Sequence, residues 1–182
     1  MEDYKFQFFL DDFWIERGTL NMEAQYSKDG QGVYQTLKIN IDADKEAIFN
    51  YLSTTEGIQQ WFPQLSFETR EVHGKMYFHL EEEDDLEMTI THFEENKVVG
   101  FTWDIGTVKF ELNRKNQQTE LTFIEYLPFE FPHIILDFAG WQFHMESIKS
   151  IAETGKSLNS QDYDFDSKNE TIKAQLKLEN EK

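Results

Sequence analysis

The sequence predicts an α+β protein in which a curved antiparallel sheet of about six or seven strands is covered by one long helix near the C-terminus. Between residues 76 and 124, short segments alternate apolar and polar residues, as half-buried strands do. From Ile134 to about Glu153, apolar residues instead recur at spacings of four and three, which is typical of a one-sided helix that Gly155 can end. Because the apolar concave face of a curved sheet must be covered, this helix is its expected cover.

The elements before these segments are a long strand and two short helices. Apolar residues alternate along residues 33–41, which predicts a half-buried strand. Asp44 then offers a capping oxygen for a first helix. Ser53 and Glu56 have the spacing of a capping box, which predicts a second short helix that must stop at Pro63.

Further strands are expected where apolar and polar residues alternate between polar turns. Because the connections are short, an antiparallel meander is favoured over a parallel sheet. The segments are residues 76–80, 86–90, 99–103, 108–112 and 121–124.

The chain divides into three zones. Residues 1–18 are an aromatic and acidic N-terminal extension, and residues 19–156 form the periodic domain. Residues 157–182 are polar, and we expect a mobile tail there with a short helix near Ile172.

Composition excludes several classes of function. The chain of 182 residues carries 35 acidic and 17 basic residues, a net charge of −18, which argues against nucleic acid or an anionic membrane as a partner. Cysteine is absent, so thiol catalysis and zinc–thiolate sites are excluded. No apolar run is long enough to span a membrane, and the N-terminus does not read as a secretory signal, so we expect a cytoplasmic protein.

Several local strings, in this order, resemble one family. They are Gly18-Thr19-Leu20, Trp61-Phe62-Pro63, Phe101-Thr102-Trp103 and Gly140-Trp141 followed by Gly155. From about Gly18 to Lys156 the chain resembles the activator-of-Hsp90-ATPase homologue 1-like (AHSA1-like) family of the START-like, Bet v 1-like (SRPBCC) superfamily. The resemblance implies a helix-grip fold with an apolar cavity between helix and sheet, which members of the superfamily use for lipids, sterols or polyketides.

The helix stripe supplies the first candidate site residues. Phe138, Trp141 and Met145 would face Phe101 and Trp103 on the sheet. Plain core packing is the simpler interpretation of such a stripe, and cavity lining is the alternative. Trp141 favours the cavity, because a buried indole N–H needs a partner.

Glu125 and His144 are the candidate polar anchors. Glu125 shares the parity of Leu121 and Phe123, so in a regular strand it points to the inner face, where a carboxylate is costly unless hydrogen-bonded. The interpretation we prefer is that the strand ends before Glu125 and the side chain reaches solvent. His144 lies beside the apolar stripe and lines either the cavity mouth or a half-exposed structural position.

No metal or cofactor site is expected. The five histidines have no metal-binding spacing. Asp162, Asp164 and Asp166 resemble the start of a calcium loop, but Ser167 stands where the loop needs glycine and Lys173 where it needs glutamate.

We therefore expect a non-enzymatic protein that binds a small aromatic or lipid-like ligand between helix and sheet, as a monomer or homodimer. One alternative is a co-chaperone that docks on an Hsp90-type ATPase, although residues 1–18 are too short for the extra N-terminal domain of the eukaryotic activators. A second alternative is an enzyme of the polyketide-cyclase kind, for which Glu125 is the sharpest acid–base candidate.

Overall fold

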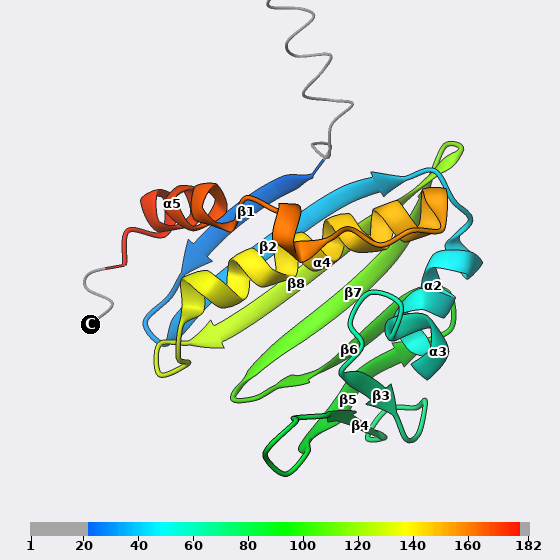
Figure 1. Cartoon of the computed structure of the whole chain (residues 1–182), viewed down its shortest axis with the longest axis horizontal. Coiled ribbons are helices and arrows are strands. Elements are labelled where there is room, and N and C mark those ends of the chain that lie inside the picture. Colours follow the sequence, from blue (N-terminus) through cyan, green and yellow to red (C-terminus); the bar gives the residue numbers. More distant parts are fainter. Residues whose placement is uncertain (1–21, 179–182) are drawn as a thin grey trace, which may run out of the picture.

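A computed structural model describes residues 22–178 and shows one antiparallel sheet with helices on one of its faces (Figure 1). The sheet has eight strands in the order β1-β2-β8-β7-β6-β5-β4-β3. The strands are β1 (Glu23–Lys28), β2 (Gly32–Ile41), β3 (Leu65–Phe67), β4 (Lys75–Phe78), β5 (Leu86–Glu94), β6 (Val98–Trp103), β7 (Gly106–Lys115) and β8 (Gln118–Pro128). The α+β class and the antiparallel meander are confirmed, and the sheet is slightly larger than the expected six or seven strands.

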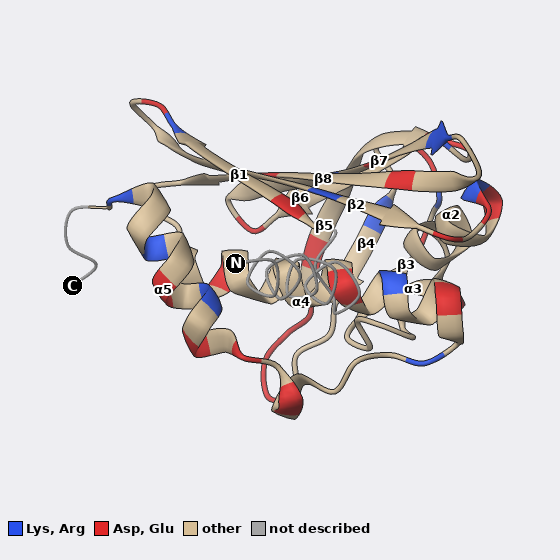
Figure 2. Ribbon diagram, turned by 90° about the horizontal axis from the view of Figure 1, so that it is seen from above, with Lys and Arg blue, Asp and Glu red and all other residues tan. Residues whose placement is uncertain are grey.

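The long helix α4 (Ile134–Thr154) lies against β2 and the neighbouring strands, as seen edge-on in Figure 2. Its apolar stripe is buried, and Phe138, Trp141 and Met145 are at most 1% exposed. The helix ends at Gly155, whose φ of 75° lies in the left-handed region that glycine adopts without strain. The predicted cover of the sheet and its predicted end are thus confirmed.

Two short helices, α2 (Lys45–Ser53) and α3 (Thr55–Ile58), follow β2 as expected. The cap of α3 differs from the prediction. The Thr54 hydroxyl, rather than that of Ser53, accepts the hydrogen bond from the Gly57 N–H at 3.0 Å. The chain then turns through Trp61 and Phe62, which are buried and bring aromatic rings to the side of α4.

The short helix expected near Ile172 is present, but it packs against the domain instead of extending from it in the expected mobile tail. A short 3-10 turn, η1 (Ser160–Asp162), leads into the helix α5 (Phe165–Leu176), which packs beside β1 and α4. Ile172 and Leu176 are buried at 0% and 3% exposure in a second apolar cluster with Val33 and Leu127. Their four-residue spacing places both on the face of α5 that contacts the domain.

The N-terminal extension at residues 1–18 and the family-like string Gly18-Thr19-Leu20 lie outside the described residues. No helix of residues 22–178 is long and apolar enough to cross a membrane.

Candidate functional site

A row of polar side chains interrupts the apolar inner face of the sheet. Glu125 on β8 lies opposite Gln35 on β2, and both are 0% exposed. The Gln35 Nε2 donates to the Glu125 Oε2 at 3.0 Å and to the Phe138 carbonyl of α4 at 3.2 Å. The preferred interpretation of Glu125 as a solvent-facing residue is therefore wrong, because β8 continues to Pro128 and keeps Glu125 on the inner face.

Glu125 forms a carboxyl pair with Asp137 in the first turn of α4. Burial, and a hydrogen bond to Asp137, raise the pKa of Glu125 well above 4.5. Burial also raises the pKa of Asp137, while hydrogen bonds from Glu125, Trp103 and Trp141 act in the opposite direction. Because two neighbouring carboxylates do not ionise together readily, the pair holds one proton over a wide pH range. We place it on Glu125, since the N-terminal end of α4 favours negative charge on Asp137.

The pair is anchored from both sides by uncharged donors. The Trp103 indole Nε1 lies 3.2 Å from each carboxylate oxygen of Asp137. On the other side, the Gln142 Nε2 donates to the Gln35 Oε1 at 2.9 Å and to the Tyr26 hydroxyl at 2.6 Å. The buried Glu125 and the partly buried Asp137 thus belong to a hydrogen-bonded chain that runs beneath α4 from β1 to β6.

The centre of the expected cavity is filled by side chains. The Trp141 ring stacks on Phe123 with centroids 4.7 Å apart and contacts Phe110 at 5.9 Å and Trp103 at 5.1 Å. Phe101, Phe138 and Met145 are 0% exposed, so core packing accounts for these three predicted wall residues. The predicted site residues that reach open space are Trp103, Trp141 and His144.

Open space remains at the mouth of the grip, on both sides of Trp103. One hollow of about 120 Å³, here called the α4 hollow, is lined by Phe62, Trp103, Leu136, Asp137, Gly140, Trp141 and His144. A second of about 160 Å³, the β5 hollow, is lined by Phe78, Leu80, Leu86, Trp103, Asp104, Phe131 and Asp137. Trp103 and Asp137 belong to both, so the carboxyl pair reaches the mouth through Asp137.

His144 forms one wall of the α4 hollow. Its imidazole stacks on Phe62 with centroids 4.2 Å apart and planes inclined by 14°. Burial lowers the pKa of His144 to about 4, so the ring is neutral at physiological pH. The mouth therefore contains an aromatic, uncharged imidazole beside an ionised Asp137.

Gly140 keeps the α4 hollow open. It lies in the middle of α4 and lines the hollow, and a methyl group added at its Cα would meet no atom within 4 Å. A glycine inside a helix costs roughly 0.5–1 kcal/mol relative to alanine. Glycine at position 140 therefore lowers the stability of α4 and leaves space beside Trp103 and Trp141.

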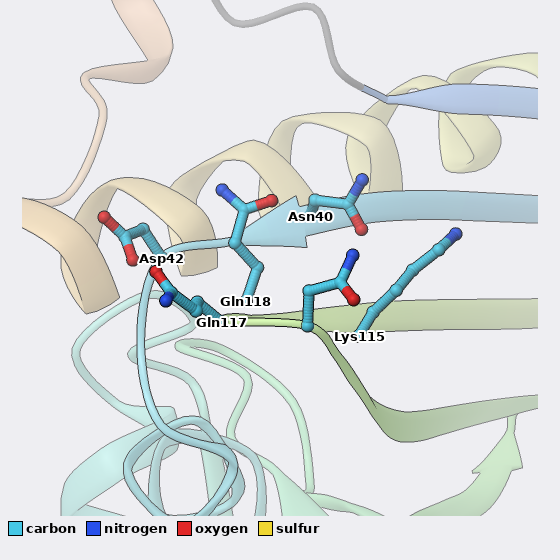
Figure 3. Close-up of a pocket in the computed structure, with 6 residues that line it drawn as sticks. Asn40, Asp42, Lys115, Gln117 and Gln118 are labelled. Carbon is cyan, nitrogen blue, oxygen red and sulfur yellow. The ribbon is translucent and has the colours of Figure 1, made fainter.

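A larger hollow of about 470 Å³ lies at the opposite end of the sheet (Figure 3). Its lining is polar and comes from the end of β2 and the turn between β7 and β8, namely Asn40, Asp42, Lys115, Asn116, Gln117 and Gln118. It contains none of the predicted site residues, and its lining does not suit an apolar ligand. Over residues 22–178, no group of three or more His, Asp or Glu side chains is placed to hold a metal ion.

Sequence reasoning missed Gln35 and Asp137. Gln35 is the polar exception among the odd-numbered apolar positions of β2, which was a readable signal. Asp137 lies four residues before Trp141 and thus next to the buried stripe, where a charged residue is unusual.

Comparison with known proteins agrees with this architecture. The family model of "Activator of Hsp90 ATPase homolog 1-like protein" (AHSA1) matches residues 42–153, which is more than half of the chain. The chain is similar to a conserved protein of unknown function, EF2215, from Enterococcus faecalis, with 30% identity and a TM-score of 0.78, over 87% of this chain and 93% of that one. A search of curated proteins found no match.

Two more distant structures share the fold. CalU16 from Micromonospora echinospora has 13% identity and a TM-score of 0.68, over 85% of this chain and 97% of that one. A structure of the Aha1 dimer from Colwellia psychrerythraea has 20% identity and a TM-score of 0.55, over 67% and 97% of the two chains. The long helix on the curved sheet is the Bet v 1-like fold. By the match to the family model and the 30% identity to EF2215, the chain belongs to the AHSA1 family.

Proposed function

We propose that this protein binds a small hydrophobic molecule, without chemistry, at the two hollows beside Trp103. The observation that carries the proposal is the space next to Gly140 inside an otherwise filled aromatic core. The hollows of about 120 and 160 Å³ are each smaller than the roughly 300–1,000 Å³ of a site for a drug-sized ligand. The ligand is therefore a single ring or a short chain rather than a sterol.

Exposed apolar side chains around the mouth support this proposal. Leu80 and Leu86 at the β5 hollow are 36% and 38% exposed, and Leu136 at the α4 hollow is 56% exposed. Such side chains lose water contact when an apolar molecule enters, which stabilises the complex by about 25 cal/mol per Å² of apolar surface buried.

A thermal-shift screen of small aromatic and aliphatic compounds tests the proposal. A compound present at 100 times its Kd stabilises the native state by about 2.7 kcal/mol, which raises the Tm of a chain of this size by roughly 5–10 °C. In a Gly140→Leu variant the new side chain occupies the α4 hollow, so the compounds are expected to lose their effect. Gly140→Ala, which adds only one methyl group, is expected to weaken binding less.

The screen contradicts the proposal if no compound raises the Tm, or if the same compounds stabilise Gly140→Leu as much as the wild type. Native mass spectrometry of the freshly purified protein adds a second measurement, because it reports both the oligomeric state and any ligand that co-purifies.

A second candidate function is docking on an Hsp90-type ATPase. The family's description and the exposed Leu80, Leu86 and Leu136 favour it, since exposed apolar side chains grouped on one surface are typical of interaction sites. Leu136→Lys places a charge on this surface. Co-sedimentation with an Hsp90 homologue that is lost in Leu136→Lys and kept in Gly140→Leu would favour docking over ligand binding.

A further inference from the structure

The ligand site beside Trp103 contains two acidic side chains, the partly buried Asp137 in both hollows and the exposed Asp104 in the β5 hollow, and its described lining includes no Lys or Arg. Asp137 lines both hollows, and its carboxylate accepts hydrogen bonds from the uncharged Trp103 indole and, through the shared proton, from Glu125. Of the residues that the structure describes, no Lys or Arg lines either hollow, and His144 is neutral at physiological pH. A partly buried carboxylate of this kind is best stabilised by a positive partner.

Aromatic faces surround this charge. Trp103 and Trp141 meet at 70° with ring centroids 5.1 Å apart, and both line the α4 hollow together with Phe62. Indole faces attract cations within about 6 Å of the ring centroid, and the attraction grows when the cation is removed from water. A carboxylate beside two indoles thus offers an ammonium group both an ion pair and cation–π contacts.

The charge of the whole molecule acts in the same direction. The net charge of −18 leaves acidic residues in excess along the chain, as Figure 2 shows for the ribbon. The resulting negative potential raises the local concentration of cations and lowers that of anions. An anionic head group is repelled both at long range and at Asp137.

We propose that the hollows beside Trp103 select amines, that is, molecules with a compact apolar body and an ammonium head that lies against Asp137 and the indoles of Trp103 and Trp141. This inference rests on the proposed function and names the chemical class of its ligand. The neutral Glu125 helps by donating a hydrogen bond to Asp137 while it keeps its proton, so the negative charge stays on Asp137 at the mouth.

Three compounds with one body and different heads test the inference: cyclohexylmethylamine, cyclohexylmethanol and cyclohexanecarboxylate. They do not absorb where tryptophan fluoresces, so calorimetry and tryptophan fluorescence can both measure binding near neutral pH. The amine is expected to bind about tenfold more tightly than the alcohol, because its ion pair and cation–π contacts act in a site with little water. The carboxylate is expected not to bind.

Two single-residue variants test whether Asp137 causes the preference for the amine over the alcohol. Asp137→Asn keeps the size of the side chain and removes its charge, so most of the preference for the amine over the alcohol is expected to be lost, although the exposed Asp104 of the β5 hollow remains. Glu130→Gln is the matched control, because Glu130 is an exposed acid at the same end of the molecule that lines neither hollow. It removes one charge as well, and the tenfold preference is expected to remain.

The outcomes separate this inference from the proposed function. If the alcohol binds the wild type as tightly as the amine, or if Asp137→Asn keeps the preference shown by Glu130→Gln, the inference is overturned. If none of the three binds while uncharged compounds of the screen still raise the Tm in a Gly140-dependent way, the inference also fails but the ligand site stands. If no compound of the thermal-shift screen raises the Tm, both the ligand site and its preference for amines are contradicted. The comparison of heads on the wild type keeps the test valid even if Asp137→Asn does not fold.

Discussion

The neutral His144 makes the fold sensitive to acid in a way that can be calculated. Burial lowers the pKa of His144 from 6.5 to about 4, so between these values the unfolded chain binds a proton that the native state does not. Stability is then fully present above pH 6.5 and is lost as the pH falls towards 4. Each pKa unit corresponds to about 1.4 kcal/mol, so the total loss is about 3 kcal/mol, of which about 2 kcal/mol falls between pH 7 and pH 5.

Urea unfolding followed by tryptophan fluorescence measures this loss in the wild type and in His144→Phe at both pH values. Phenylalanine keeps an aromatic ring stacked on Phe62 and cannot be protonated. The change in unfolding free energy between pH 7 and pH 5 is expected to be about 2 kcal/mol smaller in the variant. Other groups titrate in both proteins and cancel in this difference. Equal pH dependence of the two proteins would refute the assignment of His144 as a neutral, partly buried wall of the α4 hollow.

Three further predictions concern stability. Because the pKa of Glu125 is raised in the native state, the unfolding free energy of the wild type is expected to fall as the pH rises from about 4.5 through the native pKa. Glu125→Gln is expected to remove this fall in urea titrations. An unchanged pH dependence of the unfolding free energy would contradict the raised pKa of Glu125. Ile172→Ala is expected to cost about 2–5 kcal/mol if α5 is packed as described, whereas a Tm within error of the wild type would support a free tail. Phe138→Ala is expected to cost about 3–5 kcal/mol in denaturant unfolding, and a clearly smaller loss would indicate open space at that position.

The fold could be predicted where one pattern is long enough to be read without ambiguity. The stripe of α4 continues over five turns and ends at a glycine, so both the helix and its cover of the sheet were predicted. The three residues of β3 are too few to show alternation, and β1 is exposed along most of its length. Neither strand shows an alternation of apolar and polar residues that could be recognised in the sequence. Each is a strand because it pairs with its neighbour, β1 with β2 and β3 with β4.

A short helix near Ile172 was predicted, but its packing against the domain could not be predicted, for a related reason. Only Ile172 and Leu176 are buried in α5, and two apolar residues in a polar segment do not distinguish a docked helix from a free one. Their partners, Val33 and Leu127, come from strands more than forty residues away in sequence. Whether α5 docks is therefore determined by tertiary contacts, which the local sequence pattern does not show.

The site could be predicted in part. Strand parity placed Glu125 correctly, but the sequence did not show that β8 extends past it, since that depends on pairing between Gly32 and Pro128. The acid that pairs with Glu125 is Asp137 on α4, and no pattern in the strands indicates it. The pairing of Glu125 with Asp137 follows only from the way α4 lies on the sheet.

Two costs to stability occur at the same place, and this is the strongest argument for a site there. The fully buried carboxyl group of Glu125 is costly to desolvate, and Gly140 weakens the middle of α4. Alanine at position 140 would relieve the second cost, since an added methyl group meets no atom within 4 Å, so packing alone does not account for this glycine. A small molecule that fills the space at Gly140 and pairs with the charge on Asp137 accounts for both, because it needs the room and the carboxylate within one hollow.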